Sequence, residues 1–383
     1  MAIDNKDKKV LNVPHLRFPE FSGEWVTKSI NDLAVVIGGG TPDTTVKSYW
    51  DGEIQWFTPS EIGKNKYVDS SLRTITEVGL NNSSAKLLPP NTILLSSRAT
   101  IGECSLSLRE CATNQGFQCL VSKKCNVDFL YYLIQTKKKD LIRKSCGSTF
   151  LEISANEVRK IQVSVPSDVE QQKIAELLSL IDERIATQNK IIEDLKKLKS
   201  AISLKMLHSD SWEQFKIQDI ASIGRGRVIS SVEISQQENP LYPVYSSQTS
   251  NDGIMGYLDD FMFEGEYISW TTDGANAGTV FYRNGKFNCT NVCGLLKLKK
   301  GFDAHFVSLV LAEATRMYVS TNLANPKLMN NTMGNIQIRL PKLEEQKRIS
   351  VVFRKLHGLL ETHNSLIIKY SKQKQYLLSQ MFI

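Results

Sequence analysis

The sequence lacks the segments and motifs on which most membrane and motor functions depend. No run of about 18 apolar residues occurs in the 383-residue chain, which excludes a membrane-spanning helix. The Gly-x-x-x-x-Gly-Lys-Ser/Thr loop of nucleotide motors is missing, and residues 38–40 indicate only a turn. The first ten residues are charged and have no apolar centre, unlike a signal peptide. We therefore expect a soluble intracellular protein with no membrane association.

Metal and disulfide chemistry find little support either. The seven cysteines form no Cys-x-x-Cys pair, and an odd number spread along a chain is typical of reduced thiols inside a cell. Cys289 and Cys293, together with five histidines, make no set with metal-binding spacing. Residues 325–328 lack the second proline and the aromatic residue of an amino-methyltransferase motif. We expect a chain with no catalytic residues and no metal site.

The charge of the chain is only mildly positive. It contains 47 basic and 40 acidic side chains, a net charge of +7. The excess is uneven, because residues 341–383 carry 8 basic and 3 acidic side chains whereas residues 212–340 carry 11 and 12. Such a balance permits nucleic-acid binding but does not demonstrate it.

What the sequence does contain is a long internal repeat. The segment Val-Pro-Ser-Asp-Val-Glu-Gln-Gln-Lys-Ile (165–174) returns as Leu-Pro-Lys-Leu-Glu-Glu-Gln-Lys-Arg-Ile (340–349), and the register then holds without a gap to the last residues. A proline followed by acidic residues is typical of a helix start. In both copies the apolar residues then alternate in steps of four and three, which predicts a coiled-coil seam along one side of a long helix. The first four seam positions are Ile174, Leu178, Ile181 and Ile185 in one helix and Ile349, Phe353, Leu356 and Leu360 in the other.

Polar residues interrupt both seams at the same two steps. These are Gln188 and Lys199 in the first helix, and His363 and Lys374 in the second. The two lysines either extend to water or fix the register of the helix pair. If the helices are antiparallel, we expect that Gln188 and His363 do not face each other.

The segments that precede the two helices are also related. Residues 25–34 and 212–221 share the spacing Trp-x-x-x-x-Ile-x-Asp-x-Ala. Short strand-like runs at 54–57, 92–96 and 117–121 are separated by clusters of glycine, proline, asparagine and serine, and the second segment contains similar runs. The chain is therefore a duplication in the order domain, helix, domain, helix.

This pattern resembles the specificity subunit of type I restriction-modification enzymes. The likeness covers nearly the whole chain and includes Gly-Thr-Pro (40–42), Leu-Pro-Pro-Asn-Thr-Ile-Leu (88–94) and Thr-Asn-Gln-Gly (113–116). Its most specific part is the helix opening Pro-x-x-x-Glu-Gln-x-x-Ile, present at 166–174 and again at 341–349. The second domain lacks the Gly-Thr-Pro turn and the double proline.

The resemblance implies an α+β fold in which two pseudo-repeated target-recognition domains are separated by two long antiparallel coiled-coil helices. We place an N-terminal arm at 1–24, target-recognition domains at 25–165 and 211–340, a central spacer helix at 166–210 and a C-terminal spacer helix at 341–383.

The resemblance also implies a function. Such a chain reads a bipartite site on double-stranded DNA and docks two modification subunits, which are adenine methyltransferases, and restriction/translocase subunits. It is itself not an enzyme, and S-adenosylmethionine, ATP and Mg²⁺ are expected in the partner subunits. The expected location is the cytoplasm of a bacterial or archaeal cell.

Base reading requires side chains with paired donors or acceptors, in polar loops. The candidates in the first domain are Lys64, Lys66, Arg73, Arg98, Asn114 and Gln115. Those in the second domain are Arg225, Arg227, Ser247, Gln248, Lys286, Asn330 and Asn331. For each of them the alternative is a solvated surface residue or an amide that stabilises a turn.

Two further interpretations stay open. Glu170, Gln171, Glu345 and Gln346 either cap the starts of the two helices or lie at the junction where the resemblance places partner subunits. The rival function from another class is a coiled-coil adaptor that presents two protein-binding domains and does not bind DNA. The composition of the near-neutral second domain does not exclude it.

Overall fold

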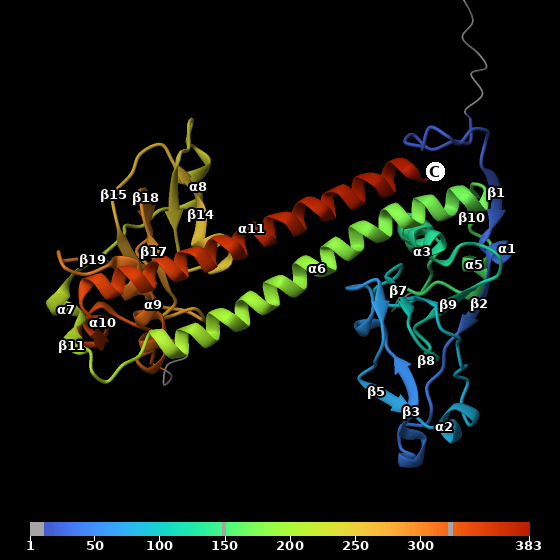
Figure 1. Cartoon of the computed structure of the whole chain (residues 1–383), viewed down its shortest axis with the longest axis horizontal. Coiled ribbons are helices and arrows are strands. Elements are labelled where there is room, and N and C mark those ends of the chain that lie inside the picture. The colour runs from blue at the N-terminus through green and yellow to red at the C-terminus, as the bar shows by residue number, and fades with distance from the viewer. Residues whose placement is uncertain (1–10, 148–150, 321–324) are drawn as a thin grey trace, which may run out of the picture. The chain divides into compact units, whose positions relative to one another are not determined.

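Two helices of 39 residues each, α6 (Asp168–Met206) and α11 (Leu343–Met381), are the longest elements of the chain (Figure 1). Both expected helices are thus confirmed, and each is about 58 Å long at 1.5 Å per residue. The computed structural model describes residues 11–147, 151–320 and 325–383. The chain forms two units. The first contains the residues up to Ile191 together with His363–Ile383, and the second contains Ile192–Thr362.

The first unit is built from small sheets with short helices. A five-stranded sheet has the order β2-β9-β6-β7-β4, a three-stranded sheet has the order β5-β3-β8, and β1 pairs with β10. The strands are β1 (Val26–Ser29), β2 (Ala34–Gly38), β3 (Trp50–Phe57), β4 (Tyr67–Val68), β5 (Arg73–Ile75), β6 (Ile93–Leu95), β7 (Cys104–Ser107), β8 (Cys111–Thr113), β9 (Gln118–Ser122) and β10 (Gln162–Val165). The helices besides α6 are α1 (Ile30–Leu33), α2 (Glu77–Asn81), α3 (Val127–Thr136), α4 (Lys138–Arg143) and α5 (Ala155–Arg159).

The second unit repeats this plan with its strands divided differently among the sheets. Its sheets have the orders β12-β19-β16-β17, β14-β13-β18-β15 and β11-β20. The strands are β11 (Glu213–Lys216), β12 (Ala221–Arg225), β13 (Tyr242–Tyr245), β14 (Ile254–Leu258), β15 (Phe263–Glu264), β16 (Tyr267–Thr271), β17 (Val280–Arg283), β18 (Lys286–Cys289), β19 (Cys293–Leu298) and β20 (Gln337–Leu340). The helices besides α11 are α7 (Ile217–Ile220), α8 (Ser231–Ser235), α9 (Ala304–Ala314) and α10 (Asn330–Asn335).

Strand register confirms the duplication. In the first unit β1 pairs antiparallel with β10, and Val26 lies opposite Val165. In the second unit β11 pairs antiparallel with β20, and Glu213 lies opposite Leu340. Val26 and Glu213 are 187 residues apart, and Val165 and Leu340 are 175 residues apart. These are the same two offsets that relate the repeats in the sequence. Each domain is therefore closed by an antiparallel pair made from its first and last strands.

The ends of the long helices belong to the cores of the two domains. In the first unit the buried cluster contains Phe129 of α3, Leu178 of α6, and Leu377 and Met381 of α11. Burial of each such side chain contributes very roughly 1.5–3 kcal/mol to the free energy of unfolding. The helices are thus fixed to the domains by packing rather than by chain connectivity alone.

The two helices are antiparallel where they meet. In the first unit, residues near the start of α6 share a cluster with residues near the end of α11. In the second unit Ile202 and Met206, near the end of α6, pack with Ile349 and Phe353 near the start of α11. The predicted seam residues Ile174, Leu178, Ile181, Ile349, Phe353 and Leu356 are buried, and Ile185 and Leu360 are half-buried. The predicted α+β class with two repeated domains and two long antiparallel helices is confirmed.

The polar seam residues correct one expectation. Nδ1 of His363 lies 2.6 Å from Oε1 of Gln188, so the prediction that these side chains do not face each other is wrong. Lys374 forms a salt bridge of 2.8 Å with Asp182 on α6, which favours the register-fixing interpretation for this lysine. No ion-pair partner of Lys199 is found among the described residues.

Candidate nucleic-acid interface and helix junctions

In the first unit, the turn after β2 lies directly against the turn after β8. The Gly40 N–H donates to the carbonyl of Thr113 at 2.8 Å. Oδ1 of Asn114 accepts a hydrogen bond of 2.8 Å from the Gly116 N–H, so this amide stabilises the turn. The next side chain, Gln115, is exposed. Of the two predicted amides, Gln115 is therefore the one that the turn presents to solvent.

A pair of tryptophans connects this turn to Arg73. The indole Nε1–H of Trp56 donates to the Gly40 carbonyl at 2.9 Å. The Trp50 ring stands edge-on to Trp56, with centroids 5.1 Å apart. The guanidinium of Arg73 lies 3.5 Å from the centre of the Trp50 ring, which holds the exposed cation in a defined plane. We call Gly40, Trp50, Trp56, Arg73 and Gln115 the first edge.

The other three candidates of the first domain lie outside this edge. Lys64 is exposed. Arg98 forms a salt bridge of 2.8 Å with Glu152. Lys66 is 6% exposed at its side chain, and its ammonium is bound by Asp128 and by the Ser179 hydroxyl at 2.7 Å. These contacts favour a structural role for Lys66, because a cation that is both paired and buried is not available to a base.

The second unit repeats the close approach of the two turns. A Cβ atom added to Gly39 would lie 2.0 Å from the Asn114 carbonyl oxygen, and one added to Gly226 would lie 1.9 Å from the Cys289 carbonyl oxygen. Only glycine fits such contacts. The residue after Gly226 is Arg227, whose guanidinium is paired with Glu233. The second domain thus places an arginine where the first has Gly40.

Sequence reasoning missed the side chain that organises this part of the second unit. Arg283 has a side chain only 2% exposed, and it forms a salt bridge of 2.7 Å with Asp252. Its guanidinium lies 3.6 Å from the centre of the Tyr245 ring. The Asn-Asp-Gly turn at 251–253, with positive φ at all three residues, marks this loop in the sequence. Nothing in the sequence indicates that Arg283 stacks on Tyr245.

The remaining candidates of the second domain divide into a pair and several separate residues. Nε of Arg225 donates to Oδ1 of Asn330 at 3.1 Å, and Asn331 follows it, exposed, on α10. We call Arg225, Arg227, Asn330 and Asn331 the second edge. Ser247 and Gln248 are half-buried. The Ser247 carbonyl accepts a hydrogen bond from the Asn276 amide, and the Gln248 amide donates to the Ile254 carbonyl. The Lys286 ammonium lies 4.5 Å from the centre of the Phe261 ring.

Gln171 and Gln346, at the two helix junctions, make equivalent hydrogen bonds in the two units. Nε2 of Gln171 donates to the Pro166 carbonyl at 3.1 Å, and its Oε1 accepts from the Asn126 N–H at 3.1 Å. Nε2 of Gln346 donates to the Pro341 carbonyl at 2.8 Å, and its Oε1 accepts from the Asp303 N–H at 2.9 Å. Each glutamine therefore joins the start of a long helix to the start of α3 or α9. This geometry gives both a capping role.

The neighbouring glutamates differ from each other. Glu170 is 1% exposed and accepts hydrogen bonds from Arg17 at 2.7 and 2.8 Å and from the Trp25 indole at 3.3 Å. The hydrogen bonds to this carboxylate raise the pKa of Arg17 above its usual value. Glu345 is exposed, and its carboxylate has no hydrogen-bond or ion-pair partner in the described part of the chain.

None of the described helices is both long and apolar enough to cross a membrane. Within the same residues, His, Cys, Asp and Glu side chains form no group of three or more that could hold a metal ion.

The chain thus consists of two repeated domains, each followed by a long helix. The family model described as the type I restriction modification DNA specificity domain matches residues 22–197 and again residues 209–369. These two matches cover most of the chain, so the chain belongs to this family. The family suggested by the sequence motifs is thereby confirmed.

Individual relatives carry the same description. The chain is 39% identical to the type I restriction enzyme MjaIX specificity subunit of Methanocaldococcus jannaschii over 46% of this chain and 42% of that protein. It is 35% identical to the putative type I specificity subunit S.MpnORF365P of Mycoplasma pneumoniae over 60% of this chain and 89% of that protein. The first match thus spans less than half of that relative's length. The crystal structure of a type I restriction-modification S subunit from M. genitalium shares the fold, with a TM-score of 0.69 at 17% identity over 97% of this chain and 99% of that one.

Proposed function

We propose that this chain is the DNA sequence-specificity subunit of a type I restriction-modification complex, and that each of its two domains reads one half of a bipartite site. The observation that carries the proposal is the double match of one DNA specificity domain to a chain whose two halves repeat one scaffold. The scaffold recurs in strand register, but the side chains at the two edges differ. One scaffold with two different edges suits two different short sequences.

In this proposal, arginine and amide side chains read base edges. Arg73 and Gln115 serve in the first domain, and Arg225 and Arg227 with Asn330 and Asn331 serve in the second. Arginine pairs with guanine through two hydrogen bonds, and asparagine or glutamine pairs with adenine. We assign the exposed Lys64 and Lys286 to phosphate contacts, which position a protein without specifying sequence.

The chain itself performs no reaction in this proposal. Two modification subunits would flip the target adenines and methylate them with S-adenosylmethionine, and restriction/translocase subunits would use ATP and Mg²⁺. The specificity subunit holds these partners on DNA in a fixed arrangement. Docking of the partners is assigned to the helices and to their junctions with the domains, where Glu345 is the exposed member of the four predicted junction residues.

Replacement of Arg73 tests the assignment of the first edge. We expect Arg73→Ala to weaken recognition of one half-site by about 1–3 kcal/mol, because a bidentate arginine–guanine contact is lost. The other half-site should be read unchanged, because the second edge lies in a separate unit. The measurement is methylome sequencing of a host that expresses the variant together with its partner subunits.

The matched control is Arg109→Ala. Arg109 is an exposed arginine of the same unit, paired with Asp69 at 2.6 Å and outside the first edge. It should leave both half-sites unchanged.

A salt titration separates the proposal from the coiled-coil adaptor. DNA binding through phosphates weakens steeply with log salt concentration, whereas an adaptor shows no DNA binding even at low salt.

A further inference from the structure

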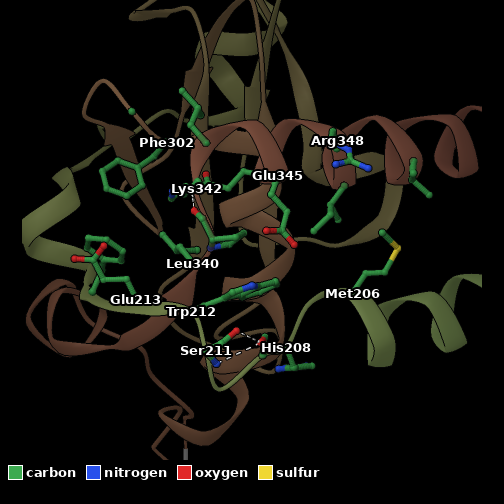
Figure 2. A pocket seen from close by; sticks show the side chains of 18 of the residues that line it. Met206, His208, Ser211, Trp212, Glu213, Phe302, Leu340, Lys342, Glu345 and Arg348 are labelled. Atoms are coloured by element: carbon green, nitrogen blue, oxygen red, sulfur yellow. Dashed lines mark hydrogen bonds between the residues drawn. The ribbon is translucent and has the colours of Figure 1, made fainter.

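The second unit contains a cavity of about 1060 Å³ where the end of α6 and the start of α11 meet the domain (Figure 2). Its apolar lining includes Trp212, Phe215 and Phe302, and its charged lining includes Glu345 and Arg348. Figure 2 shows Glu345 and Arg348 extending from the first turns of α11, with Trp212 on the segment that leads into β11. A cavity of this size and mixed lining can hold several side chains of a peptide.

In the first unit, the equivalent place is filled by the chain itself. Residues 11–24, which we call the arm, run beside the last turns of α11. Arg17 of the arm holds both carboxylate oxygens of Glu170, and Glu20 forms an ion pair with Lys173. A bidentate arginine–carboxylate contact is among the strongest polar contacts in proteins. The arm is thus anchored by two pairs of opposite charge on the first turns of α6.

Both charged anchor points recur in the cavity of the second unit. At the offset of 175 residues, Glu170 corresponds to Glu345 and Lys173 corresponds to Arg348. Both counterparts line the cavity. Glu345 has the same charge as Glu170, and Arg348 has the same charge as Lys173. The cavity therefore offers the charges that a segment with the charged residues of the arm would bind.

The backbone anchor points recur as well. In the first unit, the Leu16 N–H donates to the Gln380 carbonyl at 2.9 Å, and an asparagine of the arm donates to the Trp25 carbonyl at 2.6 Å. The counterparts of Gln380 and Trp25 in the repeat are Lys205 and Trp212. These two residues also line the cavity. Four positions that hold the arm in the first unit therefore have counterparts around the cavity in the second.

What the second unit lacks is the arm. Only five residues, 207–211, connect the end of α6 to Trp212, whereas the arm, residues 11–24, places fourteen residues before Trp25. The consequence is visible in the two glutamates, because Glu170 is 1% exposed and Glu345 is exposed. The space left beside the arm in the first unit is about 320 Å³.

We propose that the cavity of the second unit is a docking site for an irregular or extended segment of another polypeptide, in which an arginine is followed by an aromatic residue and, three positions after the arginine, by an acid. This is the pattern of Arg17, Phe18 and Glu20 in the arm. The arginine binds Glu345, and the acid binds Arg348. The segment comes from a partner subunit, because the chain's own arm is bound in the first unit; in this respect the inference rests on the proposed function.

A peptide with the sequence of residues 11–24 is the probe for this site. We expect it to bind the full chain saturably with one site, as measured by fluorescence anisotropy of a labelled peptide without DNA. Glu345→Gln should weaken the binding about tenfold or more, because a charged hydrogen-bond pair is lost. The Arg17→Ala peptide should bind the unchanged chain about tenfold more weakly than the unchanged peptide does. The Glu345→Gln chain should bind both peptides with the same low affinity, because the contact is already lost.

Glu344→Gln is the matched control, because Glu344 is an exposed acid of the same helix turn that does not line the cavity. It should leave peptide affinity unchanged. The charge-exchanged combination of Glu345→Arg in the chain with Arg17→Glu in the peptide should restore binding. Absence of saturable binding would overturn the proposal, as would binding that is insensitive to Glu345→Gln.

The identity of the occupant is tested by competition. A purified modification subunit should displace the labelled peptide from the chain, and failure to do so would overturn the assignment to a partner subunit. If the chain instead forms dimers that both Arg17→Ala and Glu345→Gln abolish, a second copy supplies the arm and the assignment is likewise wrong. These outcomes are independent of the methylome experiment, so they do not depend on whether the two edges read DNA.

Discussion

The seven cysteine thiols differ in their access to water, which a thiol reagent can measure. Cys146 is exposed and the other six are buried. Burial raises the pKa of Cys104, Cys111, Cys119 and Cys125 to about 12. Because the thiolate is the reactive form, these thiols are both shielded and protonated at pH 8. We expect one thiol to react rapidly with a chromogenic disulfide in the native chain and seven in denaturant. Two or more fast thiols before denaturation would contradict this.

His305, near the start of α9, is the residue through which acid should destabilise the second unit. Burial, with the nearby charge of Arg354, lowers the pKa of His305 to about 4, and Nδ1 lies 2.8 Å from the Ser350 hydroxyl. An unfolded histidine titrates near pH 6.5, so between about pH 6.5 and 4 the unfolded chain binds a proton that the folded chain does not. This contribution to stability is therefore complete above about pH 6.5 and is lost as the pH falls towards 4.

The experiment compares denaturant unfolding at pH 7 and pH 5. We expect His305→Asn to reduce the loss of unfolding free energy between these two values. The reference is the unchanged chain, measured at the same two pH values. Equal pH dependence of His305→Asn and the unchanged chain would refute the role of His305.

At the scale of the elements, the two seam lysines, Lys199 and Lys374, can be compared by the same substitution. Lys374 and Asp182 are 17% and 14% exposed, and the Tyr132 hydroxyl also donates to Asp182 at 2.7 Å. We expect Lys374→Met to lower the free energy of unfolding by about 1–3 kcal/mol, because Asp182 is left without its cation. Lys199→Met should cost less, because no acidic partner of Lys199 lies among the described residues. Equal costs in chemical denaturation would show that the salt bridge does not matter.

The elements also show what the sequence can and cannot predict. The alternating spacing was sufficient to predict both long helices and their seam residues, because periodicity determines which side chains share a helix face. It did not predict that Gln188 contacts His363, nor that Lys66 binds Ser179 on α6. The position of Arg283 over Tyr245 was also missed. These contacts depend on tertiary packing between segments far apart in the chain, which local spacing does not encode.

For the whole molecule, the length of the helices can be tested as a determinant of the gap between the half-sites. Seven residues inserted after Ile191 and seven after Thr362 would leave the contents of both units intact and keep the seam in phase. At 1.5 Å per residue this adds about 10 Å to each helix, or about three steps of DNA at 3.4 Å each. We expect methylome sequencing to show two unchanged half-sites with a gap longer by about three base pairs.

The control is the same insertion in α6 alone. It moves the later seam residues of α6 away from their partners on α11, so we expect a lower melting temperature and poor assembly with the partner subunits. New half-site sequences with an unchanged gap in the double insertion would contradict the role proposed for the helices.

The strand pairs that close the two domains have a consequence for how such proteins diversify. Because β1 lies beside β10 and β11 lies beside β20, the chain enters and leaves each domain at adjacent backbone positions. Genetic recombination within the codons of such a pair could replace everything between its strands and leave the flanking helices in register. If each domain reads one half-site as proposed, exchange of a single domain by crossovers at both of its closing strands gives a new half-site and leaves both long helices unchanged.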